Sequence, residues 1–357
     1  MTEPAGAKRY LMPIALGGLS AVLYSTVFLS PLFLVPVQAS GARKGFRSML
    51  ISASASGLGA CAIQLLFALR AGTVEPGMLL AGMVAPLAML IALLLVAAPK
   101  FRHIDVSLRT MFATVVAAAI TLPSLIAAGK SLQLRSLFNE AAGSATEILG
   151  TEAVNADVLW QTMSGAVLAS FGAVIFVLVF LSLWLGSRYA LTGILPVQNS
   201  KPVLPSDSAP AGTEAASETH AAATELRLVR IQAHPDPVSL PPPLAMFRVS
   251  QSLVWGLLAS WAAILAGRFV HLGALTAVAW NLAITFSVVY AFQGLAVALA
   301  LAERKGMAPA VRAFGPIVLV LLIASGAVGL VAVGLFALLG TLETWIPFRT
   351  IPKGEEP

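Results

Sequence analysis

Residues 270–302 read VHLGALTAVAWNLAITFSVVYAFQGLAVALALA, an apolar stretch without Asp, Glu, Lys or Arg. A membrane-spanning helix needs about 20 such residues, because each adds about 1.5 Å and the hydrocarbon core is about 30 Å thick. Sheet edges cannot face lipid, so a stretch of this length predicts a helix rather than strands. We therefore expect residues 270–302 to cross a membrane.

The rest of the chain repeats this pattern. Seven further apolar runs lack Asp, Glu, Lys and Arg in their interiors, at about 10–38, 48–69, 76–98, 110–129, 158–186, 249–267 and 313–341. The chain is 58% hydrophobic and 11% charged, with a mean hydropathy of +0.88, whereas a soluble domain has about 25% charged residues. This composition excludes an ordinary soluble enzyme, a disordered protein and a nucleic-acid binder. We predict an all-α fold, a polytopic transmembrane helix bundle of about seven to eight spans.

The first run, residues 10–38, has more than one interpretation. Ser30-Pro31 and Pro36 interrupt it, and a proline removes a helix hydrogen bond and clashes with the preceding turn. The run is either one kinked span or one helix followed by a short re-entrant segment. A cleaved signal peptide is a further alternative, because Lys8 and Arg9 precede the run. The apolar region is, however, much longer than the roughly 7–15 residues of a signal core.

Polar segments divide the chain into parts. We predict an N-terminal transmembrane bundle over residues 1–194, C-terminal transmembrane helices over 244–345 and a tail over 346–357. Residues 195–243 are rich in Pro, Ala, Ser and Thr and bury too little apolar area to offset their ordering entropy, which predicts a disordered linker. Residues 131–150 carry apolar side chains at helical spacing, which predicts an amphipathic helix. Since its polar face lacks a basic excess, we expect it to cap the extracytoplasmic ends of the bundle.

The distribution of positive charge predicts the orientation, because Lys and Arg resist translocation. If the first run returns to its starting side, most of the 22 Lys and Arg residues lie on one side of the membrane. A full crossing by the first run gives a smaller excess. Either version places the linker in the cytoplasm and the amphipathic helix outside, with the C-terminus outside as well. We expect a multi-pass protein of the bacterial inner, or cytoplasmic, membrane.

The sequence lacks the usual patterns of catalytic and metal sites. It has one cysteine, Cys61, in an apolar run, and its four histidines (His103, His220, His234 and His271) lie apart without metal-ligand spacing. It has no H-E-x-x-H, P-loop or nucleophile-elbow motif. We therefore expect no catalytic residues, no cofactor and no metal, and an enzyme acting on lipid is the least favoured class. Because proton-driven transporters place ionisable groups in their spans, proton coupling is also disfavoured.

Uncharged polar side chains are the candidate ligand-binding groups. The run 270–302 contains Trp280, Asn281, Tyr290 and Gln293, and Gln64 of the second run is a candidate for the same cavity. A mostly apolar cavity with a few placed polar groups can bind a small solute without charged residues. The alternative is that these side chains only join helices to one another, as most amides in transmembrane helices do.

Three further patterns concern packing and interfaces. The string ISASASGLGAC at 51–61 predicts close helix packing, because small residues let helix backbones approach. Gln251 and Trp255 are four residues apart and follow Arg248, which fits either an interfacial anchor or the mouth of a pocket. Trp345 and Arg349 indicate another interfacial anchor.

The last third of the chain carries a family resemblance. Asn281 with YAFQGLAV at 290–297, the basic loop ERKGM at 303–307 and LGTLETWIPFR at 339–349 resemble the YybS-like family, bacterial multi-pass membrane proteins of unknown function. That family usually has D-x-W-F-D-F-R near the last position, where this chain has Glu343 for the first Asp and Ile346-Pro347 for Phe-Asp. The family is distantly related to the substrate-binding subunits of energy-coupling-factor vitamin transporters. The resemblance thus implies binding of a small solute and a separate ATPase module as partner.

Two functions remain open at this point. We expect a non-enzymatic protein that binds or translocates a small solute, with membrane lipids and a transporter ATPase module as partners. The alternative is a scaffold in a cell-envelope or division-related assembly, which would bind envelope proteins through the linker or the amphipathic helix. Nucleic acid is not an expected partner in either case.

Overall fold

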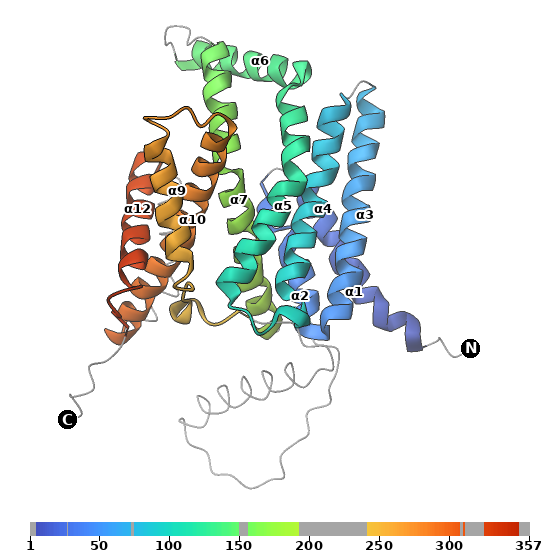
Figure 1. Ribbon diagram of the computed structural model, residues 1–357. Helices are drawn as coiled ribbons and strands as arrows, with labels where there is room; N and C mark the ends of the chain where they lie inside the picture. The colour runs from blue at the N-terminus through green and yellow to red at the C-terminus, as the bar shows by residue number, and fades with distance from the viewer. Residues whose placement is uncertain are drawn as a thin grey trace, which may run out of the picture. The chain divides into compact units, whose positions relative to one another are not determined.

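The computed structural model describes residues 5–26, 28–72, 75–149, 156–192, 241–307, 310 and 325–349 (Figure 1). Within these residues the chain is all-α, with ten α-helices and three short 3-10 turns. The all-α fold predicted from hydropathy is confirmed within these residues. Most of the predicted linker, the first part of the eighth run up to residue 324, and the tail beyond residue 349 lie outside the described residues.

Five described helices are long and apolar enough to cross a membrane: α3 (Phe46–Ala71), α4 (Pro76–Ala97), α5 (Val106–Gly129), α7 (Ala156–Thr192) and α10 (Ala274–Arg304). Three further helices have shorter apolar parts: Tyr10–Ser25 of α1 (Ala5–Ser25), all of α9 (Leu253–Ala266), and Val328–Leu342 of α12 (Ala327–Leu342). The 14 residues of α9 rise only about 21 Å, less than the roughly 30 Å of the hydrocarbon core. The described residues therefore support five candidate spans, and the larger number predicted from the apolar runs is not shown.

The chain divides into two compact units. Unit 1 comprises Met1–His103 and Leu178–Pro241, and unit 2 comprises Ile104–Val177 and Pro242–Pro357. Helix α7 contributes its second part to unit 1 and its first part to unit 2. This division differs from the predicted one at the linker, because α5 and the first part of α7 cluster with the C-terminal helices.

In unit 1 the first apolar run forms two helices joined by a turn. After α1 come a 3-10 turn, η1 (Ser30–Leu32), and the short α2 (Leu34–Lys44). The Ser20 hydroxyl donates a hydrogen bond of 2.5 Å to the carbonyl of Phe33, so the start of α2 lies beside the middle of α1. The 11 residues of α2 rise only about 16 Å. This arrangement favours a helix with a short returning segment over one kinked span.

Small residues bring α1 and α3 into close contact within unit 1. A Cβ on Gly17 would overlap the carbonyl oxygen of Ser52, and a Cβ on Gly59 would lie 2.8 Å from Cβ of Ala21. The hydroxyls of Ser20 and Ser56 are 2.6 Å apart. The close packing predicted for residues 51–61 is thereby confirmed.

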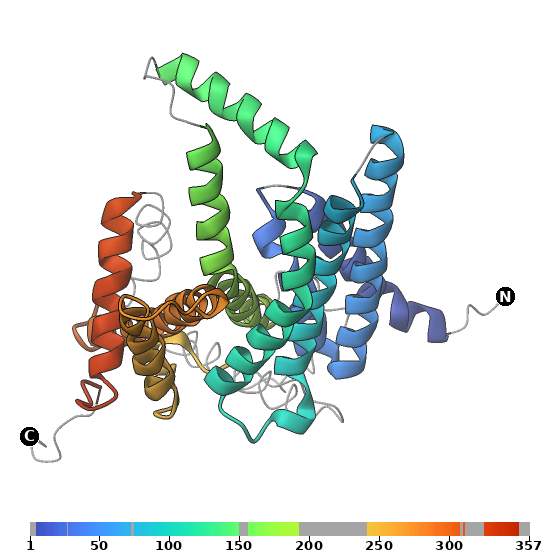
Figure 2. The ribbon, with the colours of Figure 1, turned by 45° about the horizontal axis from the view of Figure 1, so that its top comes forward.

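In unit 2 an amphipathic helix connects two candidate spans. Helix α6 (Leu132–Leu149) lies across the ends of α5 and α7 (Figures 1 and 2). Arg135 of α6 forms a 2.5 Å ion pair with Asp157 of α7, and the rings of Phe138 and Trp160 pack edge to face with centroids 5.2 Å apart. Helix α6 occupies the segment for which the sequence predicts an amphipathic helix.

The C-terminal part of unit 2 contains a 3-10 turn, η3 (Leu244–Met246), followed by α9, α10 and α12. Helices α10 and α12 touch at Gly294 and Gly340. A Cβ on Gly294 would overlap the carbonyl oxygen of Phe336, and a Cβ on Gly340 would overlap that of Tyr290. The two backbones are in direct contact at this crossing.

Candidate functional site

A partly buried segment of unit 2 that is not α-helical precedes α9 and includes the start of the sixth apolar run. The sixth apolar run was expected to be helical from residue 249, but α9 begins only at Leu253. We call residues 245–250 the entry segment. Two of its side chains are almost fully buried, since Phe247 is 3% and Val249 8% exposed. In a membrane protein the polar backbone groups of such a segment need partners, because lipid offers none.

Side chains from distant parts of unit 2 supply these partners. Arg349 donates hydrogen bonds of 2.6 Å to the carbonyl of Ala245 and 2.9 Å to that of Phe247. The backbone N–H of Val249 donates to Oε1 of Gln293 at 2.9 Å, and that of Ser250 donates to the hydroxyl of Ser107 at 3.2 Å. These contacts replace the hydrogen bonds that a helix would have provided.

The side chain of Arg349 forms a buried ion pair with Glu343. Nε donates to Oε1 of Glu343, and Nη2 donates to Oε2 at 2.6 Å. The two side chains are only 7% and 4% exposed. Burial of a charge is costly without a partner, so each of these residues depends on the other.

This ion pair corrects two expectations from the sequence. Arg349 was expected to be an interfacial anchor, and only uncharged polar side chains were expected at the binding site. The chain turns after α12 and folds Arg349 back onto the entry segment, while Trp345 remains 60% exposed. Because both charges lie beyond the last apolar run, a search for charges within the runs could not detect the pair.

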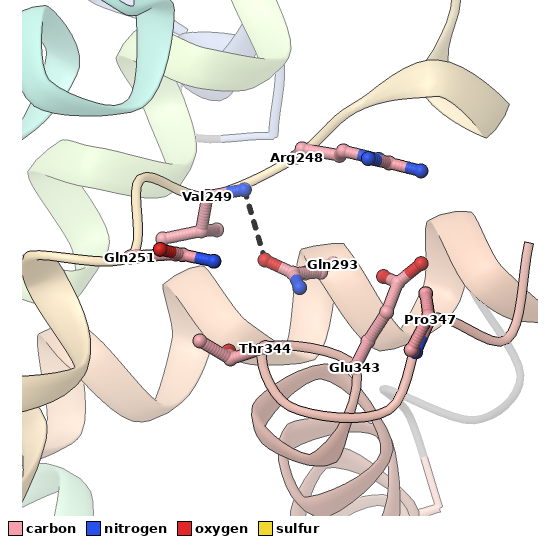
Figure 3. Close-up of a pocket in the computed structure, with 7 residues that line it drawn as sticks. All are labelled: Arg248, Val249, Gln251, Gln293, Glu343, Thr344 and Pro347. Atoms are coloured by element: carbon pink, nitrogen blue, oxygen red, sulfur yellow. Dashed lines mark hydrogen bonds between the residues drawn. The ribbon is translucent and has the colours of Figure 1, made fainter.

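A cavity of about 90 Å³ lies beside the entry segment (Figure 3). It is lined by Arg248, Val249, Gln251, Gln293, Glu343, Thr344 and Pro347. Pockets for drug-sized ligands are larger, roughly 300–1,000 Å³. Residues with guanidinium, amide, hydroxyl and carboxylate side chains line the cavity, so it suits a polar molecule of a few heavy atoms.

Gln293 is the one residue of the predicted site that lines this cavity. Its side chain is 3% exposed. Oε1 accepts the hydrogen bond from Val249, and Nε2 donates a 3.0 Å hydrogen bond to the carbonyl of Gly340. Gln293 thus joins α10 to both α12 and the entry segment, and presents part of its amide to the cavity.

Asn281 joins α10 to α7 instead. Its Nδ2 donates a 2.5 Å hydrogen bond to the carbonyl of Leu168, and its Oδ1 accepts one of 3.1 Å from the N–H of Gly172. In a regular helix, backbone groups four residues apart bond to each other. The amide of Asn281 contacts this pair of groups, which is the helix-joining role given as the alternative for these amides.

The other predicted residues lie elsewhere. Tyr290 is fully buried, and its hydroxyl, close to Thr344, has no hydrogen-bond partner of normal geometry among the described residues. Trp280 is 38% exposed, and its ring packs edge to face on Trp261. Gln64 belongs to unit 1, where its amide lies beside Gly82 of α4.

Some of the remaining cavity residues were predicted from the sequence, and others were not. Of the three residues interpreted as an anchor or a pocket mouth, Arg248 and Gln251 line the cavity, whereas Trp255 does not and is 71% exposed. Glu343 and Thr344 were not predicted as cavity residues, although they belong to the string LGTLETWIPFR that carries the family resemblance. Within the described residues, no group of three or more His, Cys, Asp and Glu side chains is placed to hold a metal ion.

One comparison with known proteins gives a match. Residues 232–339 match the family described as "Predicted membrane protein (DUF2232)". The matched residues include Arg248, Gln251 and Gln293 but end before Glu343. No curated protein and no solved structure matches the chain. The YybS-like name and the relation to vitamin transporters stay predictions, whereas the match and the five long apolar helices together identify a multi-pass membrane protein.

Proposed function

We propose that this membrane protein binds a small polar solute in the cavity of unit 2 without converting it chemically. The observation that supports the proposal is the cavity beside the entry segment. In membrane proteins, non-helical backbone at the depth of the spans occurs where it is buried in protein or lines a cavity. Binding sites of many transporters lie at such interruptions.

The size of the cavity limits the solute. A volume of about 90 Å³ suits a molecule of a few heavy atoms, which is smaller than the vitamins that the family resemblance implies. Translocation of the solute would need energy from a partner, and the ATPase module expected from the resemblance is our proposal for it.

The proposal is tested with purified protein in a neutral detergent. We measure the melting temperature by tryptophan fluorescence against a panel of small neutral, anionic and cationic metabolites. A ligand should raise the melting temperature in a saturable way, because it binds only the folded state. Gln251→Leu should reduce the shift, since it removes a polar cavity group whose amide forms no hydrogen bond with the other described residues.

Asn281→Leu serves as the control. It breaks the contacts with Leu168 and Gly172 and should lower the melting temperature of the free protein, yet leave the ligand-induced shift unchanged. A panel without any shift, or a shift that Asn281→Leu abolishes and Gln251→Leu does not, would exclude this cavity as the solute site.

A further inference from the structure

The charges around the cavity do not cancel. Glu343 directs both carboxylate oxygens to Arg349. Arg349 in turn uses Nε, Nη1 and Nη2 for Glu343 and the two backbone carbonyls of the entry segment. This pair is neutral as a whole, and its hydrogen-bonding capacity is almost fully used.

Arg248 adds a further positive charge at the same cavity. Within the described part of the chain, its guanidinium takes part in no ion pair or hydrogen bond. In the view of Figure 3 its side chain extends away from Gln251 and Gln293, and the amide of Gln251 is turned toward Gln293. The cavity therefore carries a net positive charge and has unused hydrogen-bond donors from Arg248 and Gln251.

We propose that this cavity selects a small oxyanion, such as a monocarboxylate of a few heavy atoms, and that Arg248 binds it. The inference rests on the proposed function, because it names the class of solute. A guanidinium matches a carboxylate with two parallel hydrogen bonds, which are stronger than neutral ones. Glu343 does not repel the anion as a free carboxylate would, since Arg349 neutralises it.

The phosphate of a lipid headgroup has the same chemistry as a free oxyanion. Long cationic side chains near helix ends often reach such headgroups. The experiment therefore needs separate arms for a soluble carboxylate and for a lipid.

The first arm uses protein in neutral detergent without added lipid. We compare acetate, acetamide and methylammonium at equal ionic strength, with the melting temperature as the readout. Acetate should raise it in a saturable way, and the neutral and cationic analogues should not. Arg248→Gln should weaken the apparent acetate affinity roughly tenfold or more, because a hydrogen bond to a charged group is lost. Arg268→Gln, in a loop of the same unit, should leave the affinity unchanged.

The second arm adds short-chain phosphatidylglycerol in place of acetate. A shift that depends on Arg248 with the lipid and not with acetate supports oxyanion binding, identifies the headgroup as its source, and overturns the proposal of a soluble solute.

The other outcomes separate the two proposals. An acetamide shift equal to that of acetate, or an acetate shift that Arg248→Gln leaves intact, overturns the oxyanion inference and leaves solute binding standing. The absence of any shift in both arms overturns the oxyanion inference, and a metabolite panel without any shift overturns solute binding as well.

Discussion

Unit 1 and unit 2 differ in the side chains that hold their buried segments together. In unit 1, α1 and α3 touch through Gly17, Gly59 and a pair of serine hydroxyls. In unit 2, the long polar side chains of Arg349 and Gln293 bond to the backbone of a segment that is not helical.

This difference indicates what each unit can do. Where every backbone group is satisfied within a helix, small residues suffice for packing, and close backbone contact leaves little space. Where a segment is not helical, its backbone groups need side-chain partners. In unit 2 those partners hold the segment beside a cavity. We therefore expect the largest effects of single substitutions in unit 2.

Two natural probes report on the units separately. The single cysteine, Cys61, lies in α3 of unit 1. Five of the six tryptophans belong to unit 2, Trp184 being the exception. Reaction of Cys61 with a thiol dye therefore follows unit 1, and tryptophan fluorescence mainly follows unit 2.

Removal of the Arg349 side chain should have the largest effect. Arg349→Met leaves Glu343 buried without a partner and frees two backbone carbonyls. We expect a loss of about 3–5 kcal/mol in the free energy of unfolding, measured by denaturant titration with tryptophan fluorescence.

The double variant Glu343→Met/Arg349→Met shows whether the charge is responsible. It removes the unpaired carboxylate and should recover part of the stability that Arg349→Met alone loses. If the double variant is as unstable as the single one, the ion pair is not the reason for the loss. Arg268→Met, outside the ion pair, is the matched control.

The contacts of Arg349 could not be predicted from the sequence, whereas several of the helices could. The runs 48–69, 76–98 and 110–129 predicted α3, α4 and α5 closely, because lipid forces an apolar chain to satisfy its backbone within a helix. The same rule did not predict that the entry segment is not α-helical. Phe247 and Val249 are as apolar as residues of a span, and the groups that replace the helix bonds lie 44 and 102 residues away along the chain.

The candidate site was predictable to a similar extent. Gln293 was found because a buried amide in a span needs a partner, and the sequence could not tell whether that partner is a helix or a ligand. In the structure Gln293 bonds to the entry segment and to α12 and also lines the cavity, whereas Asn281 bonds to α7. Glu343 was missed because it lies just beyond the eighth apolar run, at the end of α12.

Substitutions at the crossing of α10 and α12 should have the next largest effect on the free energy of unfolding. Gly294→Ala or Gly340→Ala places a Cβ against a backbone carbonyl of the other helix, and we expect a loss of about 1–3 kcal/mol in the free energy of unfolding. Gly334→Ala on α12 meets open space and should be neutral or slightly stabilising, since alanine favours helix more than glycine does. Equal losses in all three variants would show that the close approach at the crossing is not the cause of the loss.

Gly17 and Gly18, which are adjacent in α1, allow the same comparison in unit 1. Gly17→Ala places a Cβ against the carbonyl oxygen of Ser52, whereas Gly18→Ala meets no atom within 4 Å. We expect Gly17→Ala to cost about 1–2 kcal/mol and to speed the reaction of Cys61, and Gly18→Ala to change neither. The change should be smaller in tryptophan fluorescence than in Cys61 reactivity. A larger change in tryptophan fluorescence than in Cys61 reactivity would show that the two probes do not report on the units separately.

The smallest effect is expected from the serine pair of unit 1. Ser20→Ala removes the hydrogen bond to the carbonyl of Phe33 and the contact with Ser56. The helix turn in α1 remains, so we expect a loss of only about 0.6–1.5 kcal/mol, in the range of single polar contacts between membrane helices. Ser25→Ala, which removes only a local bond to the carbonyl of Val22, is the control and should change the rate of Cys61 labelling less. A loss for Ser20→Ala as large as that for Arg349→Met would mean that unit 1 also depends on a single polar side chain, here to hold α2 against α1. The two units would then not differ in the side chains that hold their buried segments together.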